Sequence, residues 1–133
     1  MAKVPHFLLP MLRNADRELV LSTNGTAQPI ATRLIGAFDS ASRKRGLLGR
    51  ASIGADEALI IAPCSAVHTF GMRFAIDIVY ADRAGRVIKI RQAVQPKRLS
   101  GAWGAFAVIE LAAGTAARTG LKRGDLLEIG TRS

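Results

Sequence analysis

Three side chains near the middle of the sequence are of types that carry out nucleophilic chemistry. Cys64 precedes His68 by four residues, and Asp77 follows later. A thiol, an imidazole base and a carboxylate that orients the base are the parts of a cysteine-dependent active site. Residues four apart meet on one face of a helical turn, whereas in an extended strand they lie about 13 Å apart. Pro63 permits either conformation, so the contact between thiol and imidazole stays open.

The same segment, residues 63–77, is also dense in groups that bind ligands without reacting. A lone cysteine is more often a small buried side chain than a nucleophile. We therefore expect a non-enzymatic accessory or ligand-binding domain, and we keep a cysteine-dependent enzyme that uses Cys64 and His68 as an alternative. The expected binding residues are Cys64, His68, Thr69, Arg73, Asp77 and Arg91.

Metal binding has little support in the composition. The chain has one cysteine and two histidines, and a closed zinc site normally takes four such ligands. Two of the three, Cys64 and His68, are close in sequence, whereas His6 is near the N-terminus. We expect neither a metal nor a cofactor.

The charge balance favours contact with something anionic. Nineteen Lys and Arg against ten Asp and Glu give a net charge of +9. Such a charge promotes association with nucleic acid, a lipid surface or an acidic protein, although it also occurs in basic proteins that bind none of these. A nucleic-acid-binding surface on the hairpin 83–98 is a second alternative. The expected basic surface consists of Arg43, Lys44, Arg45, Arg86, Lys89, Lys97 and Arg98.

The cysteine count and the lengths of the apolar runs bear on the compartment and on membrane association. A single cysteine allows no internal disulfide, which fits a reducing compartment. Pro5 and Pro10 interrupt the apolar residues near the N-terminus, so we expect no signal peptide. No apolar run reaches the length of a membrane span. We expect a cytoplasmic protein.

Two segments must position the polar residues of 63–77. Glu57–Ala62 is an apolar run that predicts a buried strand ending at Pro63. Phe74–Tyr80 predicts a strand with Phe74, Ile76, Ile78 and Tyr80 on one face and the residues between them on the other.

The hairpin that follows allows its register to be predicted. A three-residue loop, Arg83-Ala84-Gly85, puts Gly85 where a left-handed residue is required and keeps apolar side chains opposite each other. This register pairs Ile78 with Ile90, Tyr80 with Ile88, and Asp77 with Arg91, the last as an ion pair.

The remaining elements are short. Strands are expected at 18–23, 30–38, 106–111 and 126–129, with a turn at Asn24-Gly25. A short helix capped by Ser40 or Ser42 is expected to end at Gly49, although Gly46 within it is unfavourable, and a second is expected over 115–119, ending at Gly120. Short connections favour antiparallel pairing. The fold class is α+β and mostly β: an antiparallel sheet curled toward a small barrel, with two short helices. Residues 1–15 are expected to be a flexible arm and 16–133 a single globular domain.

Three sequence stretches carry a family resemblance. They are Arg45–Arg50, Pro63–Asp77 and the tail, which contains Val108–Leu111, Gly120-Leu121 and Gly124-Asp125. Together they resemble domain of unknown function family 192 over roughly residues 30–130. The resemblance implies a small β-rich fold with short helices. It implies no established activity, and so no catalytic residues.

Overall fold

The computed structural model describes residues 6–13, 18–24 and 28–131. Within these residues the chain is mostly β, as predicted, and has three short helices. The elements in chain order are α1 (Leu9–Arg13), β1 (Leu19–Thr23), β2 (Arg33–Ala37), α2 (Ser40–Arg45), β3 (Glu57–Ile61), β4 (Ala66–His68), β5 (Ile76–Ala81), β6 (Val87–Val94), β7 (Leu99–Gly101), β8 (Ala107–Ala112), α3 (Thr115–Thr119) and β9 (Leu127–Thr131). No helix among the described residues is long and apolar enough to cross a membrane.

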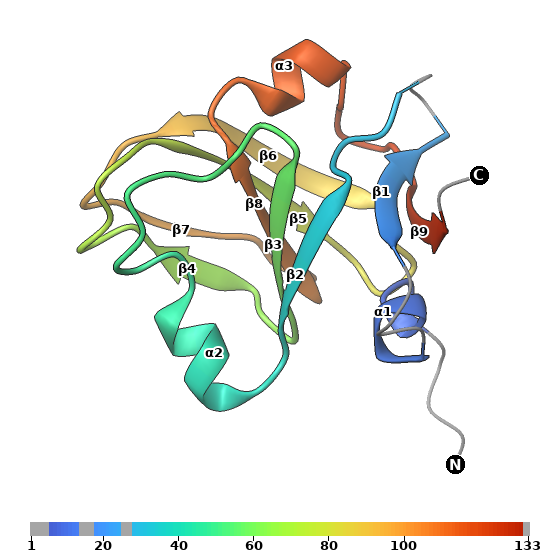
Figure 1. Cartoon of the computed structure of the whole chain (residues 1–133), viewed down its shortest axis with the longest axis horizontal. Coiled ribbons are helices and arrows are strands. Elements are labelled where there is room, and N and C mark those ends of the chain that lie inside the picture. The colour runs from blue at the N-terminus through green and yellow to red at the C-terminus, as the bar shows by residue number, and fades with distance from the viewer. Residues whose placement is uncertain (1–5, 14–17, 25–27, 132–133) are drawn as a thin grey trace.

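A five-stranded sheet in the order β2-β3-β8-β5-β6 forms the centre of the molecule (Figure 1). Three of its four strand pairs are antiparallel, but β2 and β3 run parallel. The prediction of an antiparallel sheet is therefore wrong for this pair. The chain leaves β2, forms α2 and returns alongside β2, which is the crossover that a parallel pair requires. The two edge strands, β2 and β6, do not pair with each other, so the expected curl toward a barrel is not confirmed.

The three inner strands, β3, β8 and β5, are buried on both faces, which explains their mostly apolar sequences. Ile76, Ile78 and Tyr80 belong to one hydrophobic cluster, whereas Val79 and Ala81 belong to another. The predicted alternation of faces along this strand is confirmed.

Each cluster is covered by a small two-stranded sheet. The pair β1–β9 lies over the cluster that contains Val79 and stands beside α1 (Figure 1). The pair β4–β7, here called the ribbon, lies over the cluster that contains Ile78. The Tyr80 hydroxyl and the Ser100 hydroxyl are 2.7 Å apart, which ties the ribbon to the main sheet. The sequence analysis missed both ribbon strands, because three-residue strands carry almost no periodicity.

The β5–β6 hairpin begins as predicted and then departs from the predicted register. Gly85 has φ +96°, and Ala81 pairs with Val87, which is the register of the predicted loop. The register then shifts by one residue, so Ile78 pairs with Arg91 and not with Ile90. A β-bulge inserts one extra residue in one strand, and a turn-based argument does not detect it. The predicted Asp77–Arg91 ion pair is therefore wrong.

A second bulge explains what Asp77 does instead. Asp77 is fully buried, and its carboxylate accepts hydrogen bonds from the backbone N–H groups of Ala93 and Ala116, both at 2.9 Å. Ala93 has φ +50° and lies where the β5–β6 register shifts again. Hydrogen bonds from backbone amides stabilise an ionised carboxylate. Asp77 thus joins the bulge of β6 to the start of α3.

The two predicted helices are present, with corrections at the ends of the first. Asp39, not Ser40, caps α2: its carboxylate accepts from the Ser42 N–H at 2.7 Å in a capping box. The helix ends at Gly46. Helix α3 spans the predicted residues and ends at Gly120. The strands predicted at 18–23, 57–62, 106–111 and 126–129 are present within two residues, whereas the segment predicted at 30–38 forms a strand only over Arg33–Ala37.

Part of the N-terminal segment packs on the core. Leu8 is buried in the cluster with Val79, and the Phe7 N–H donates to the Arg83 carbonyl at 2.9 Å. Helix α1 follows, which the sequence analysis did not predict. The domain boundary at residue 15 stays a prediction. The turn predicted at Asn24-Gly25 extends outside the described residues.

Candidate functional site

A cavity of about 600 Å³ opens between α2 and β4. The last turn of α2 and the loop after it form one wall, β4 forms another, and side chains of β3 and β8 form the floor. Ligand sites of small domains are commonly concave, largely apolar and furnished with a few convergent polar groups. The polar and charged side chains that line this cavity are Ser40, Arg43, Lys44, Arg45, Cys64, His68 and Glu110.

Glu110 is the most unusual of these residues. It lies in the middle of β8, between Leu59 of β3 and Ile78 of β5, and is only 3% exposed. No hydrogen bond or ion pair joins its carboxylate to any residue that the structure describes. Burial alone raises the pKa of Glu110 to about 7, because the charged form loses its hydration and gains no partner.

The Glu110 carboxylate opens into the cavity. A Cβ atom placed on Gly46, at the end of α2, would lie 3.8 Å from Glu110 Oε1. Every fully enclosed side-chain nitrogen or oxygen in the described part of the chain has a hydrogen-bond partner. The Glu110 oxygens have none, so they must reach the cavity space. The floor therefore presents a hydrogen-bond acceptor that the protein itself does not use.

Cys64 lies on the cavity wall as a protonated thiol. Its Sγ donates to the Ala66 carbonyl at 3.2 Å. Burial raises the pKa of the Cys64 thiol, and the negative charge of Glu110 raises it further, whereas the hydrogen bond with the Ala66 backbone and the charge of Arg43 oppose this only in part. Since the thiolate is the nucleophilic form, this environment disfavours attack by Cys64 at neutral pH.

His68 shares the cavity with Cys64 but is not bonded to it. It lies on β4 opposite Leu99, is exposed, and packs its ring 5.8 Å from that of Phe70. No hydrogen bond joins Cys64 to His68 among the described residues. Asp77 faces the opposite side of β5, where it pairs with Leu111, and does not line the cavity. Of the three residues singled out in the sequence, Cys64 and His68 therefore line the cavity, whereas Asp77 has a structural role.

Three consecutive cations approach the cavity from α2. Arg43, Lys44 and Arg45 form the last turn of this helix, where the partial negative charge of its carbonyl end favours cations. The Arg43 guanidinium is fixed by a 2.9 Å hydrogen bond from Nη1 to the Phe38 carbonyl. Lys44 and Arg45 are exposed at the opening. With Glu110 ionised, the four charged side chains carry a net charge of +2.

Most of the chain matches a known protein family. A family model matches residues 19–129, which is most of its length and includes α2, β4 and Glu110. The chain belongs to the DUF192 family. That family is described as an uncharacterized ACR, so the resemblance inferred from the sequence is confirmed and brings no activity with it. No curated protein matches the chain.

Two crystal structures are similar to this DUF192 domain. A protein of unknown function from Novosphingobium aromaticivorans DSM 12444 shares 25% sequence identity, with a TM-score of 0.73 over 96% of this chain and 93% of that one. A protein from Sinorhizobium meliloti 1021, described as a "putative transcription regulator", shares 21% identity, with a TM-score of 0.74 over 96% and 97%. At 21% identity the second shows only a common fold.

The other predicted binding residues of this DUF192 domain lie outside the cavity lining. Thr69 is buried, and its hydroxyl donates to the Gln95 carbonyl at 2.7 Å and accepts from the Arg98 N–H at 2.9 Å. Thr69 thus holds two loops together. Arg73 is exposed beyond the cavity, and Arg91 is half-buried on β6 opposite Ile78.

Two cations of the hairpin 83–98, Arg86 and Lys89, bind the backbone of neighbouring loops. Arg86 Nη1 donates to the Gly124 carbonyl at 2.8 Å, and Lys89 Nζ donates to the Gly101 carbonyl at 2.6 Å while lying 5.6 Å from the Tyr80 ring. Lys97 and Arg98 are exposed. Arg86 and Lys89 thus each have a separate structural contact. No group of three or more His, Cys, Asp or Glu that could hold a metal occurs in the described part of the chain.

Glu110 was absent from the sequence-based candidates, although a signal for it exists. The strand Ala107–Ala112 is apolar except for this one carboxylate. In an inner strand both faces are buried, so a charge at its centre must enter the core or a cavity. A search for single charges inside buried strands would have found it.

Proposed function

We propose that this protein is a binding module for a small polar molecule, which it holds in the cavity between α2 and β4. The observation that carries the proposal is the buried, unpartnered Glu110 carboxylate that opens into that cavity. A carboxylate buried in this way disfavours folding unless it is paired. A ligand that donates a hydrogen bond or a positive charge to Glu110 supplies the missing partner.

A purely structural role for Glu110 has no support among its contacts. Structural carboxylates elsewhere in the chain are satisfied: Asp77 by two backbone amides, and Glu57 by the Gly54 N–H and Arg50. Glu110 instead lies between Leu59 and Ile78, where an apolar side chain would complete the cluster. Strongly perturbed carboxylates in clefts are typical of functional sites.

The surroundings of Glu110 favour binding over reaction. Cysteine catalysis needs a thiolate and a base, but the Cys64 thiol donates to a backbone carbonyl and its pKa is raised. Asp77, the third member of the hypothetical triad, lies on the other face of β5. The cavity thus offers recognition groups without an assembled nucleophile. This supports the accessory or ligand-binding role expected from the sequence and moves its centre from the polar segment 63–77 to Glu110.

The test uses ethylammonium and ethanolamine as probes, because each is small and donates to a carboxylate. Backbone amide shifts of the protein are followed by NMR during titration at pH 8, where Glu110 is mainly ionised. We expect saturable shifts at Gly46, Leu47 and Ala66. We expect at least about tenfold weaker binding in Glu110→Gln, since an amide carries no charge for the ammonium.

The matched control is Glu128→Gln, which removes the same charge from an exposed position on β9. It should bind both probes as the unmodified protein does. Equal binding of the probes by the Glu110→Gln variant, or shifts spread over surfaces away from the cavity, would overturn the proposal.

A further inference from the structure

We propose that the natural ligand is bipolar: a small molecule with an ammonium group that meets Glu110 and an anionic group that meets Arg43, Lys44 and Arg45. This inference rests on the proposed function and specifies its ligand class. It follows from the way in which the cavity separates its charges. The floor presents one acceptor, and the wall formed by α2 presents three cations.

The cations of α2 do not neutralise Glu110 themselves. No ion pair joins Glu110 to any described residue, and only burial perturbs its protonation. Arg43 instead donates from Nη1 to the Phe38 carbonyl at 2.9 Å. Two unlike charges that face one cavity without pairing leave room for a molecule that satisfies both.

The cations and the carboxylate lie near each other around the cavity. A Cβ atom on Gly46 would lie 3.8 Å from Glu110 Oε1, and Lys44 and Arg45 directly precede Gly46. The Cα atoms of these two cations are thus roughly 5.5 and 4 Å from that of Gly46. Both cations also line the cavity. A molecule of a few carbon atoms is therefore the size to test, and we choose probes with a two-carbon backbone.

Arg43 makes the anionic end of the site partly preorganised. One guanidinium N–H is held by the Phe38 carbonyl, and a guanidinium has five N–H donors in total. The remaining donors have a fixed direction, which favours a planar or multidentate acceptor such as a carboxylate or phosphate. Phosphate and carboxylate share this chemistry, so the experiment must distinguish them.

Four probes with a two-carbon backbone separate the contributions: phosphoethanolamine, β-alanine, ethylammonium and ethyl phosphate. Binding is measured by NMR titration at pH 8 in low salt. We expect at least one of the two bipolar probes to bind about tenfold or more tightly than ethylammonium or ethyl phosphate, because the second contact is made within one bound molecule. The better of the two identifies the anionic group as phosphate or carboxylate.

Variants assign each end of the ligand. Lys44→Gln with Arg45→Gln should reduce binding of the bipolar probe toward the level of ethylammonium, with Arg43 retaining part of the contact to the anionic group. Glu110→Gln should reduce it to the level of ethyl phosphate. The matched control is Lys97→Gln with Arg98→Gln, which removes an equivalent adjacent pair of exposed cations from outside the cavity lining and should change affinity less than twofold.

The outcomes also distinguish the two proposals. If ethylammonium binds as tightly as both bipolar probes and depends on Glu110, the bipolar ligand class is wrong and the proposed binding function stands. If no probe shows a dependence on Glu110, the proposed function fails and the ligand class fails with it.

Discussion

Replacing Glu110 by Gln should stabilise the protein at and above neutral pH, although Glu110 is the residue on which we propose that ligand binding depends. The carboxylate is 3% exposed, has no partner among the described residues, and has a pKa raised to about 7 by burial. In the unfolded chain the same group titrates near its ordinary value of 4.5. Between these two pH values the folded protein retains a proton that the unfolded chain has released.

The sign and size of the effect follow from this difference in pKa. Where the folded state binds more protons, its stability falls as the pH rises, so the loss accumulates between pH 4.5 and 7 and is complete above pH 7. A difference in pKa from 4.5 to about 7 corresponds to roughly 3 kcal/mol. Glutamine stays neutral throughout, so the variant should gain about 3 kcal/mol relative to the original protein between pH 4.5 and 8.

Urea unfolding at several pH values measures this gain. The measured quantity is the urea midpoint of the variant minus that of the original protein. With an m-value on the order of 1.5 kcal/mol/M, this difference should be roughly 2 M larger at pH 8 than at pH 4.5. His6 also titrates in this interval: burial and Arg83 lower its pKa, so its contribution is lost as the pH falls below 6.5. That contribution is common to both proteins and cancels in the comparison. A constant difference in stability from pH 4.5 to 8 would refute the assignment of Glu110 as a buried, unpaired acid.

Two further substitutions test the roles assigned to Asp77 and Cys64. Asp77→Ala should lower the free energy of unfolding by about 3 kcal/mol or more, because two buried amides lose a charged acceptor; urea unfolding that shows a loss below about 1 kcal/mol would contradict this role. Cys64 should react with iodoacetamide at pH 7.5 more slowly than free cysteine does, because its thiol is protonated and donates to a carbonyl. The Cys64→Ser variant should retain probe binding within about twofold, because a hydroxyl can donate to the same carbonyl. Alkylation at the rate of free cysteine, followed by mass spectrometry, would argue against this environment.

The faces of the strands could be predicted from the sequence because alternation is a local property. Ile76, Ile78 and Tyr80 share a face whatever the register of the neighbouring strand. The left-handed conformation of Gly85 could also be predicted from the sequence, because a positive φ in a tight turn favours glycine. These features depend on a few adjacent residues, so a short window of sequence contains their cause.

The register and the site depend on contacts that no short window contains. The shift at Ala93 occurs where its N–H meets Asp77, sixteen residues away, and that carboxylate also binds Ala116 of α3. The cavity likewise joins α2, β4 and β8, which are brought together only by the parallel crossover and the ribbon. The sequence therefore indicated Cys64 and His68, which stand near each other in the chain, but not their association with Glu110.

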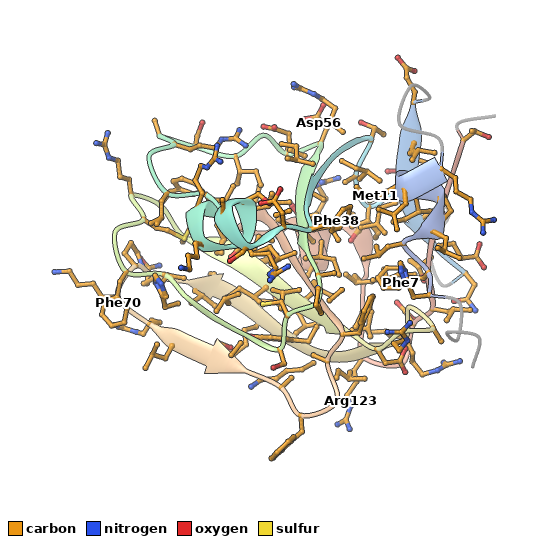
Figure 2. All side chains as sticks on the ribbon, turned by 90° about the horizontal axis from the view of Figure 1, so that it is seen from below. Phe7, Met11, Phe38, Asp56, Phe70 and Arg123 are labelled. Carbon is orange, nitrogen blue, oxygen red and sulfur yellow. The ribbon has the colours of Figure 1, made fainter. Side chains whose placement is uncertain are left out.

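The ribbon forms a wall of the cavity that does not belong to the five-stranded sheet. Strands β4 and β7 pair only with each other, and side-chain contacts such as the one between Tyr80 and Ser100 attach them to the main sheet (Figure 1). Phe70, just beyond β4, projects from the end of the molecule opposite Phe7 and Met11 (Figure 2). Substitutions along this wall therefore leave the backbone pairing of the five-stranded sheet in place. The shape of this wall can change separately from that sheet, whereas Glu110, on β8, couples the proposed ligand site to fold stability.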